Sequence, residues 1–284
     1  MMSSCWQITF SPKTEPSDDF KQFLEDFFEV TAQNYDDNGN DDYIGYCSDF
    51  DEQLMIKASS NITLPPYKVE KLESTNWLKD YVIRFAPFEV DDFLIYGIHE
   101  EQTPKTDKIP LQIYAATAFG SDHQTTRSCL KAICDLYHQG FTPQKILDIG
   151  TGSGILSLAA ARLWPNAQII AVDIDEEAVL VTQSNAQNNQ LDSHIIACQS
   201  NGYQSELVRN NAPYDLILAN ILARPLLEMC HDTSNSLSNG GYTILSGFVD
   251  EQEDWVINNH QQQGLTLSKL YRTDNWRAAL MQKE

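Results

Sequence analysis

The stretch "KILDIGTGSGIL" (residues 145–156) decides the fold, because an apolar strand-like run passes through three glycines into an apolar helix-like run. Glycines at a strand-to-helix turn permit positive φ and let a ligand approach the backbone, and these are Gly150, Gly152 and Gly154. Nineteen residues after Gly154, Asp173 follows a second apolar run. A carboxylate at that point can accept hydrogen bonds from ribose hydroxyls. The combination indicates a nucleotide-binding α/β domain.

Two cofactors compete for this pattern. The dinucleotide fingerprint G-x-G-x-x-G requires glycine at position 155, where this chain has Ile155. Asp148 stands two residues before the first glycine, and it suits the ammonium of a methionine moiety better than a pyrophosphate. The pattern therefore favours S-adenosylmethionine over NAD. The sequence contains no G-K-[ST] loop, so hydrolysis of a nucleoside triphosphate is not indicated.

Apolar runs alternate with helix-length segments after about residue 112. These runs are 145–150, 168–174, 194–199, 214–220 and 242–247. The alternation predicts a parallel sheet covered on both faces. By strand counting, the fourth run lies beside the glycine-loop strand at the topological switch point, and Asn220 ends it at the place where ligands bind. An amide that only opens the following loop is the alternative.

The first portion of the chain predicts a small α+β unit. We expect a strand at 5–10, a helix at 17–29, and strands near 43–47 and 53–58. The acidic stretch 36–52 is interpreted as a solvated loop with one strand inside it. The polar, proline-bearing stretch 99–110 is interpreted as a linker.

The charge of the chain limits its partners. The formal net charge is −21, and residues 1–100 carry 20 acidic and 7 basic side chains. Such a surface repels phosphate backbones and attracts a basic partner, so no direct nucleic-acid binding is expected. The six cysteines contain no C-x-x-C pair, which indicates reduced thiols without a metal site. Without a signal-like N-terminus or a long apolar run, we expect a cytoplasmic monomer that does not enter membranes.

Several motifs resemble one known family. "AFGSDHQTTRSCL" (118–130), "LDIGTGSGIL", "AVDID", "LANILARPL" and "LSNGGYTILSG" are similar to motifs of the ribosomal protein methyltransferase family PrmA, which modifies protein eleven of the large subunit. The resemblance implies a class I S-adenosylmethionine-dependent methyltransferase, Rossmann-like with a mostly parallel sheet. It also implies a small N-terminal α+β ferredoxin-like domain that recognises the basic ribosomal protein. The expected division is 1–75 for that domain, 76–111 for an interdomain linker region and 112–284 for the catalytic domain.

The resemblance also implies site residues. Carried over by motif position, the cofactor contacts are Thr126, Gly150, Asp173 and Asn220, with Phe119, Gly152 and Gly154 as neighbours. The loop 118–126 is one residue shorter than the family pattern and keeps only Gly120 where the family has two glycines. No metal is required by the expected reaction.

The expected chemistry is methyl transfer to lysine side chains, and to the N-terminal amine, of the ribosomal protein. Asn220 would be catalytic, because its carbonyl oxygen can accept a hydrogen bond from the attacking amine. His123 is interpreted as a loop-packing or substrate-positioning residue, with a general base as the alternative. Enzymes that methylate a nucleic-acid base or a glutamine carry N-P-P-Y at this strand end, whereas this chain has "NILA". Another protein or a small molecule as substrate, and a cofactor-binding protein without turnover, remain as alternatives.

Overall fold

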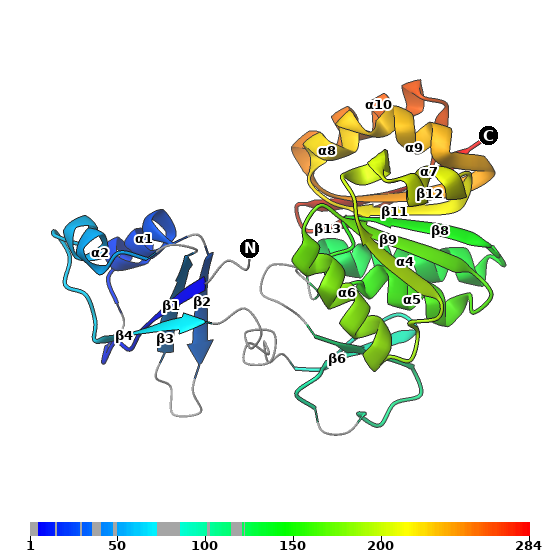
Figure 1. Ribbon diagram of the computed structural model, residues 1–284. Coiled ribbons are helices and arrows are strands. Elements are labelled where there is room, and N and C mark those ends of the chain that lie inside the picture. Colours follow the sequence, from blue (N-terminus) through cyan, green and yellow to red (C-terminus); the bar gives the residue numbers. More distant parts are fainter. Residues whose placement is uncertain are drawn as a thin grey trace. The chain divides into compact units, whose positions relative to one another are not determined.

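The computed structural model describes residues 5–14, 16–28, 30–35, 41–47, 50–72, 86–100, 103–114, 121 and 123–284. The chain divides into two compact units, Met1–Tyr81 and Val82–Glu284 (Figure 1).

The first unit is a four-stranded antiparallel sheet with two helices. Its elements are β1 (Cys5–Phe10), α1 (Asp18–Phe27), β2 (Val30–Tyr35), β3 (Asp41–Cys47), α2 (Glu52–Ala58) and β4 (Tyr67–Leu72). The strand order is β2-β3-β1-β4, and β1 pairs antiparallel with both β3 and β4. A βαββαβ chain with this order is ferredoxin-like, which confirms the expected fold of the N-terminal portion.

Local sequence explains one correct and one wrong prediction in this unit. The helix predicted at 17–29 is confirmed as α1, and the side chain of Ser17 caps it by accepting a hydrogen bond from the Phe20 N–H at 3.3 Å. The strand predicted at 53–58 is wrong, because these residues belong to α2. Asp51 accepts hydrogen bonds from the first N–H groups of that helix, and only Met55 of the helix is buried. A short apolar run is compatible with either a strand or a helix. Here the capping hydrogen bonds of Asp51 favour the helix.

The second unit is built on a seven-stranded sheet. Its strands are β8 (Lys145–Ile149), β9 (Gln168–Asp173), β10 (Ile195–Gln199), β11 (Tyr214–Asn220), β12 (Leu237–Val249), β13 (Leu265–Thr273) and β14 (Trp276–Lys283). The order is β10-β9-β8-β11-β12-β14-β13. The first five strands are parallel, and β14 is antiparallel to both of its neighbours. The predicted parallel sheet is confirmed, whereas the β13–β14 hairpin was not predicted.

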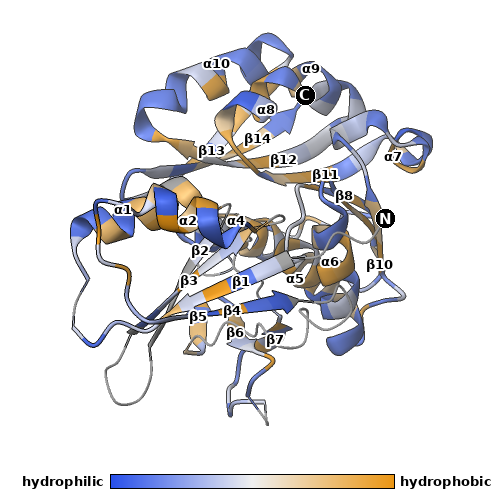
Figure 2. Cartoon of the chain, turned by 60° about the vertical axis from the view of Figure 1, so that its left-hand side comes forward, coloured by the Kyte–Doolittle hydropathy of each residue, from blue (hydrophilic) through white to orange (hydrophobic). Residues whose placement is uncertain are grey.

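Helices cover both faces of this sheet (Figure 1). They are α4 (Gln124–His138), α5 (Ile155–Leu163), α6 (Glu176–Asn188), α7 (Glu206–Asn211), α8 (Ala223–Glu228), α9 (Cys230–Ser236) and α10 (Glu253–Gln262), with short 3-10 turns η2 (Gly202–Gln204) and η3 (Asp250–Gln252). Successive strand residues face opposite cores: Ile146 packs in the core that contains α4 and α5, and Leu147 packs in the core that contains α8 and α10. Figure 2 shows hydrophobic residues on strands between the two helical layers. Within the described ranges, no helix is long and apolar enough to cross a bilayer.

A small three-stranded sheet occupies part of the region expected to be a linker. It consists of β5 (Phe88–Val90), β6 (Phe93–Gly97) and β7 (Ile109–Ile113), in that order. Phe93, Ile95 and Leu111 are fully buried in the same core as α4 and α5. The polar stretch 99–110 begins after β6, and its last two residues belong to β7. Residues 88–113 therefore pack as part of the second unit.

The buried His260 on α10 gives a pH-dependent contribution to stability. Its Nδ1 lies 2.8 Å from the Val256 carbonyl oxygen, and no described residue partners its Nε2. Burial lowers the pKa of His260 below its ordinary value of 6.5. The imidazole of His260 is therefore protonated at a higher pH in the unfolded chain than in the folded chain. As the pH falls below about 6.5, this difference lowers the free energy of unfolding.

His260→Leu should flatten this pH dependence. The free energy of unfolding, measured with urea at about pH 8 and about pH 5.5, should fall less for the variant than for the parent. The exposed His231, changed to Gln, is the control and should keep the slope of the parent. Equal slopes for the parent and His260→Leu would contradict the assignment.

Candidate active site

A cleft of about 530 Å³ opens at the carboxyl ends of β8, β9, β10 and β11 in the second unit. This volume lies in the range of roughly 300–1,000 Å³ that small-molecule sites occupy. The lining residues are His123, Thr125, Thr126, Ile149, Gly150, Gly152, Asp173, Ile174, Ser200, Asn201, Gly202, Asn220, Ile221, Leu222, Pro225, Met229, Gly247 and Trp276.

The cleft brings together most of the residues that the sequence indicated. Thr126, Gly150, Gly152, Asp173 and Asn220 all line it. Gly154 does not line it. Phe119 lies outside the described residues, as do Ala118, Gly120 and Asp122 of the shortened loop.

The glycine loop between β8 and α5 is shaped by close approach of the backbone. Gly150 has φ of 68°, and a Cβ there would lie 2.2 Å from the Cγ2 of Ile221. Gly154 has φ of 79° and precedes α5, where a Cβ would press on Thr182. A side chain at either position would therefore move the loop. Gly154 shapes the loop from the side away from the cleft.

Asp148 holds the glycine loop and does not line the cleft. Its Oδ2 accepts hydrogen bonds from the hydroxyls of Thr151 at 2.9 Å and Ser157 at 2.6 Å. Burial raises the pKa of Asp148 to about 6, against the opposing effect of these two hydroxyls. These bonds engage Oδ2 alone, so the expected contact of Asp148 with the ammonium of a ligand stays a prediction.

Asp173 ends β9 at the floor of the cleft. Its Oδ2 accepts a hydrogen bond from the Gly152 N–H at 3.0 Å, and its Oδ1 accepts one from the Asp175 N–H at 3.1 Å. A carboxylate has about four acceptor sites, so each oxygen can accept a further bond from a ligand hydroxyl. The adjacent Ile174 is 67% exposed and also lines the cleft, which places an apolar surface next to the carboxylate.

Asn220 ends β11 and is held through its amide nitrogen. Nδ2 donates a hydrogen bond to Oγ1 of Thr126, which lies on α4, at 3.1 Å. Thr126 is itself buried. No residue in the described ranges donates to Oδ1 of Asn220, so this carbonyl oxygen remains available to a donor in the cleft.

The ends of three neighbouring strands meet around Ile221. Its N–H donates to the Ser246 carbonyl oxygen on β12 at 3.0 Å. Gly247 has φ of 93°, and a Cβ there would lie 2.0 Å from the Ile221 carbonyl oxygen. Gly150 approaches the side chain of Ile221 from β8. The position of Asn220, the preceding residue, is thus fixed by backbone packing on both sides.

His123 and Trp276 form an aromatic pair on the lining of the cleft. His123 precedes α4, and its Nδ1 accepts a hydrogen bond from the Thr125 N–H at 3.3 Å. The two rings pack edge to face with centroids 4.7 Å apart. The ring of His123 thus caps a helix and packs on Trp276, in line with the packing role that the sequence indicated.

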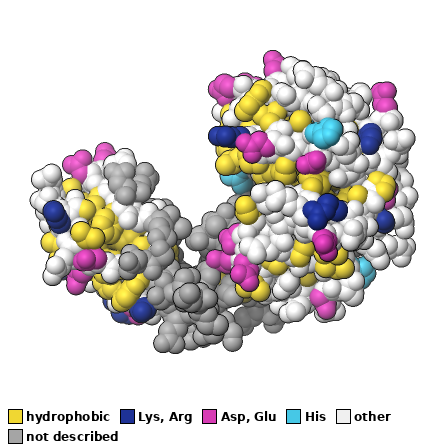
Figure 3. Space-filling view, turned by 45° about the horizontal axis from the view of Figure 1, so that its top comes forward, with side chains coloured by type: hydrophobic (Ala, Val, Ile, Leu, Met, Phe, Trp, Pro, Cys, Tyr) yellow, Lys and Arg dark blue, Asp and Glu magenta, His cyan; other side chains and the backbone are white. Residues whose placement is uncertain are grey.

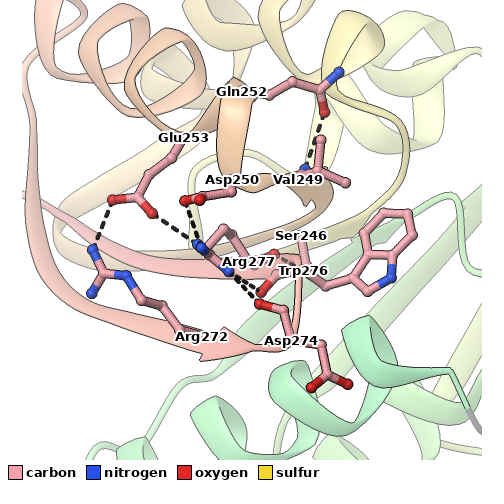
Figure 4. A network of polar contacts seen from close by, with 9 residues as sticks. All are labelled: Ser246, Val249, Asp250, Gln252, Glu253, Arg272, Asp274, Trp276 and Arg277. Carbon is pink, nitrogen blue, oxygen red and sulfur yellow. Dashed lines mark hydrogen bonds and ion pairs between the residues drawn. The ribbon is translucent and has the colours of Figure 1, made fainter.

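A buried arginine holds the hairpin that carries Trp276 (Figure 4). The guanidinium of Arg277 pairs with Asp250 at 2.5 Å and with Glu253 at 2.9 Å. It also donates to the carbonyl oxygens of Asp274 and Trp276, each at 3.0 Å. Figure 4 shows the Trp276 indole extending away from this guanidinium. The ion pairs therefore fix the turn between β13 and β14 and, with it, one wall of the cleft.

Sequence reasoning missed several lining residues. Ser200, Asn201 and Gly202 follow β10, so the rule that ligands bind at strand ends could have found them. Trp276 offered no such signal, because its hairpin was not predicted. Among the described residues, no three His, Cys, Asp or Glu side chains gather as a metal site would require.

Comparison with known proteins identifies relatives over most of the chain. The family model "Ribosomal protein L11 methyltransferase (PrmA)" matches residues 11–284. A ribosomal protein L11 methyltransferase from Brucella suis is 35% identical over 232 residues, which are 81% of each chain. One from Bradyrhizobium diazoefficiens is 31% identical over 232 residues, 81% of this chain and 78% of that protein.

A solved structure agrees with these matches. The crystal structure of a ribosomal protein L11 methylase from Lactobacillus delbrueckii subsp. bulgaricus has a TM-score of 0.63 and 25% identity, and the match covers 70% of this chain and all of that one. The strand order, the glycine loop and the strand-end cleft are those of a class I methyltransferase. Because the family model and these relatives extend over most of the sequence, the chain belongs to the ribosomal protein L11 methyltransferase (PrmA) family.

Proposed function

We propose that this S-adenosylmethionine-dependent methyltransferase transfers methyl groups to amines of ribosomal protein L11, on lysine side chains and at the N-terminus, in the cytoplasm. The named activity of its relatives supports this substrate. One observation of the structure carries the chemistry. Asn220 presents an available carbonyl oxygen to the cleft, while its nitrogen is engaged by Thr126.

The cleft fits the cofactor in shape and polarity. S-adenosylmethionine supplies a methyl group bonded to a positively charged sulfur. We assign Asp173 to the ribose hydroxyls and the exposed apolar Ile174 to the adjacent base. Gly150 and Gly152 line the cleft at the glycine loop, and we assign the methionine moiety to this part of it, because glycine lets a ligand approach the backbone closely. Thr126, which belongs to α4, also lines the cleft, and it accepts a hydrogen bond from the amide of Asn220.

Positioning of a neutral amine is the main contribution that the protein makes. Lysine has an ordinary pKa near 10.4, and burial beside apolar groups lowers it, which favours loss of the proton. Leu222 and Trp276 supply apolar surface in the cleft, and Leu222 is 71% exposed before any substrate binds. The carbonyl oxygen of Asn220 then accepts an N–H of the amine and turns its lone pair toward the methyl carbon. Such alignment can contribute a large part of the rate enhancement.

The first unit is proposed to recognise the protein substrate. The chain carries a formal net charge of −21, and Figure 3 shows Asp and Glu side chains distributed over the drawn face of both units. A basic substrate would therefore be steered to the enzyme, and its association would weaken as salt rises. We place this recognition in the ferredoxin-like unit because the second unit contains the whole described cleft.

Asp173→Asn should weaken binding of the cofactor. The substitution keeps the size of the side chain but removes the charge that would accept the ribose hydroxyls. A hydrogen bond to a charged group contributes about 1.5–3 kcal/mol, so we expect roughly ten- to a hundredfold weaker binding of S-adenosylmethionine by calorimetry. Asp175→Asn is the matched control, because Asp175 is exposed and caps α6, a role that Asn also fills. Unchanged affinity in a folded Asp173→Asn chain would remove this assignment.

Asn220→Ala should abolish most methyl transfer while the protein stays folded. Misplacement of a reacting group can cost on the order of a hundredfold in rate, and we expect a loss of kcat of that size. Methylation of purified L11 is followed by mass spectrometry, which also locates the modified amines. Failure of the parent chain to methylate L11 lysines or its N-terminus would refute the proposed substrate.

A matched variant separates chemistry from general damage to the cleft. Asn201→Ala removes another asparagine of the lining, at the end of β10, and should leave kcat close to that of the parent. Normal turnover by Asn220→Ala, together with an early thermal transition, would mean that Asn220 has only a structural role.

A chain that begins at Val82 should bind S-adenosylmethionine but methylate L11 poorly. This start removes the first unit and retains β5 and β6, whose Phe93 and Ile95 belong to the core of the second unit. Raising the salt concentration should increase the KM for L11 of the full chain and have little effect on the shortened one. Full activity of the shortened chain toward L11 would show that the first unit does not recognise the substrate.

A further inference from the structure

Asn185 of α6 and Asn189, the residue that directly follows α6, bind the backbone at and just after β7 as a neighbouring strand would. Asn185 accepts a hydrogen bond from the Tyr114 N–H at 2.7 Å and donates one to the Tyr114 carbonyl oxygen at 3.0 Å. Asn189, one helical turn later, makes the same pair of bonds with Gln112 at 3.0 and 2.6 Å. In an antiparallel ladder, two opposite residues exchange bonds in this way. The two side-chain amides thus bind the backbone of Gln112 and of Tyr114, which lie two residues apart along the chain.

Only Asn185 also reaches the glycine loop. Its Nδ2 donates a second hydrogen bond to the Ser153 carbonyl oxygen at 2.8 Å. One turn earlier on α6, the Thr182 hydroxyl donates to the Gly152 carbonyl oxygen at 3.0 Å. Asn189 instead donates its second bond to the Asn185 carbonyl oxygen on α6. Two successive carbonyl groups of the loop are therefore held by α6, the second of them by Asn185.

These bonds act on Gly152, which lines the cleft, and on Ser153, the residue that follows it. The N–H of Gly152 is held by Asp173, and its carbonyl is held by Thr182, so the peptide groups on both sides of Gly152 are held. The carbonyl of the next residue, Ser153, is held by Asn185, which is fully buried. Loss of a donor in a buried site leaves its acceptor without a partner, which favours rotation of that peptide.

We propose that Asn185 is a positioning residue for S-adenosylmethionine binding, which fixes the glycine loop by holding the Ser153 carbonyl to the backbone of Tyr114. It acts through the loop and does not line the cleft. The same amide couples the end of β7 to the cofactor site. The inference concerns the cofactor, so it is independent of which protein is methylated.

The two asparagines provide a matched pair of variants. Asn185→Ala and Asn189→Ala each remove a buried amide and its two bonds to the strand, but only the first removes the bond to the loop. In the full chain, Asn185→Ala should weaken S-adenosylmethionine binding about tenfold by calorimetry, the effect of one buried hydrogen bond, and Asn189→Ala should change it less than about twofold. The KM for the cofactor should rise in the Asn185→Ala chain, with kcat little changed. Equal affinities in the two variants, whether both weakened or both unchanged, would overturn the proposal.

A measurement on the unmodified chain covers the case in which Asn185→Ala fails to fold. The Tyr114 N–H donates to Asn185, and the Gln112 N–H donates to Asn189. Saturation with S-adenosylmethionine should slow hydrogen exchange of the Tyr114 amide more than that of the Gln112 amide. The reason is that Asn185 binds both Tyr114 and the glycine loop, whereas Asn189 binds Gln112 but not the loop. Equal slowing of the two amides would refute the coupling.

Discussion

The close packing around Ile221 is the constraint on which the rest of the site depends. The end of β11 passes between β8 and β12 only because Gly150 and Gly247 have no side chains to obstruct it. The Ile221 N–H is bonded to β12, so the crossing is fixed in direction as well as in distance. Asn220 directly precedes this crossing and is placed at the cleft by the backbone. The bond to Thr126 then needs only to set the rotation of its amide.

The features that sequence could predict are those carried by continuous runs of residues. The five parallel strands are carried by short, mostly apolar runs, and the glycine loop follows the first of them directly. Counting strands placed Asn220 beside that loop, and the pairing of β11 with β8 confirms it. Counting works here because consecutive elements of a doubly wound sheet take a limited number of orders. The caps of α1 and α2 are equally local, although Asp51 was not used to predict the second helix.

The rest depends on contacts between distant segments. Thr126 and Asn220 are 94 residues apart, and His123 meets Trp276 across a still longer stretch of chain. Asp148 lies two residues from a glycine that lines the cleft, yet its carboxylate is directed at Thr151 and Ser157. The spacing from Gly150 predicted that Asp148 lies near the site, but it did not predict the direction of the side chain. The Arg277 network was equally hidden, because its carboxylates come from η3 and α10.

The amides of Asn185 and Asn189 also protect the protein against association. Among the strands that the structure describes, β7 lies at the edge of its sheet and pairs with β6 alone. An open strand edge offers unpaired N–H and C=O groups to the strands of other molecules, and natural proteins cover such edges. Here two side chains, one on α6 and one directly after it, occupy the positions that an incoming strand would use, at Gln112 and Tyr114. These side chains, one helical turn apart, thus cover the strand edge, and the backbone groups of Gln112 and Tyr114 are already bonded.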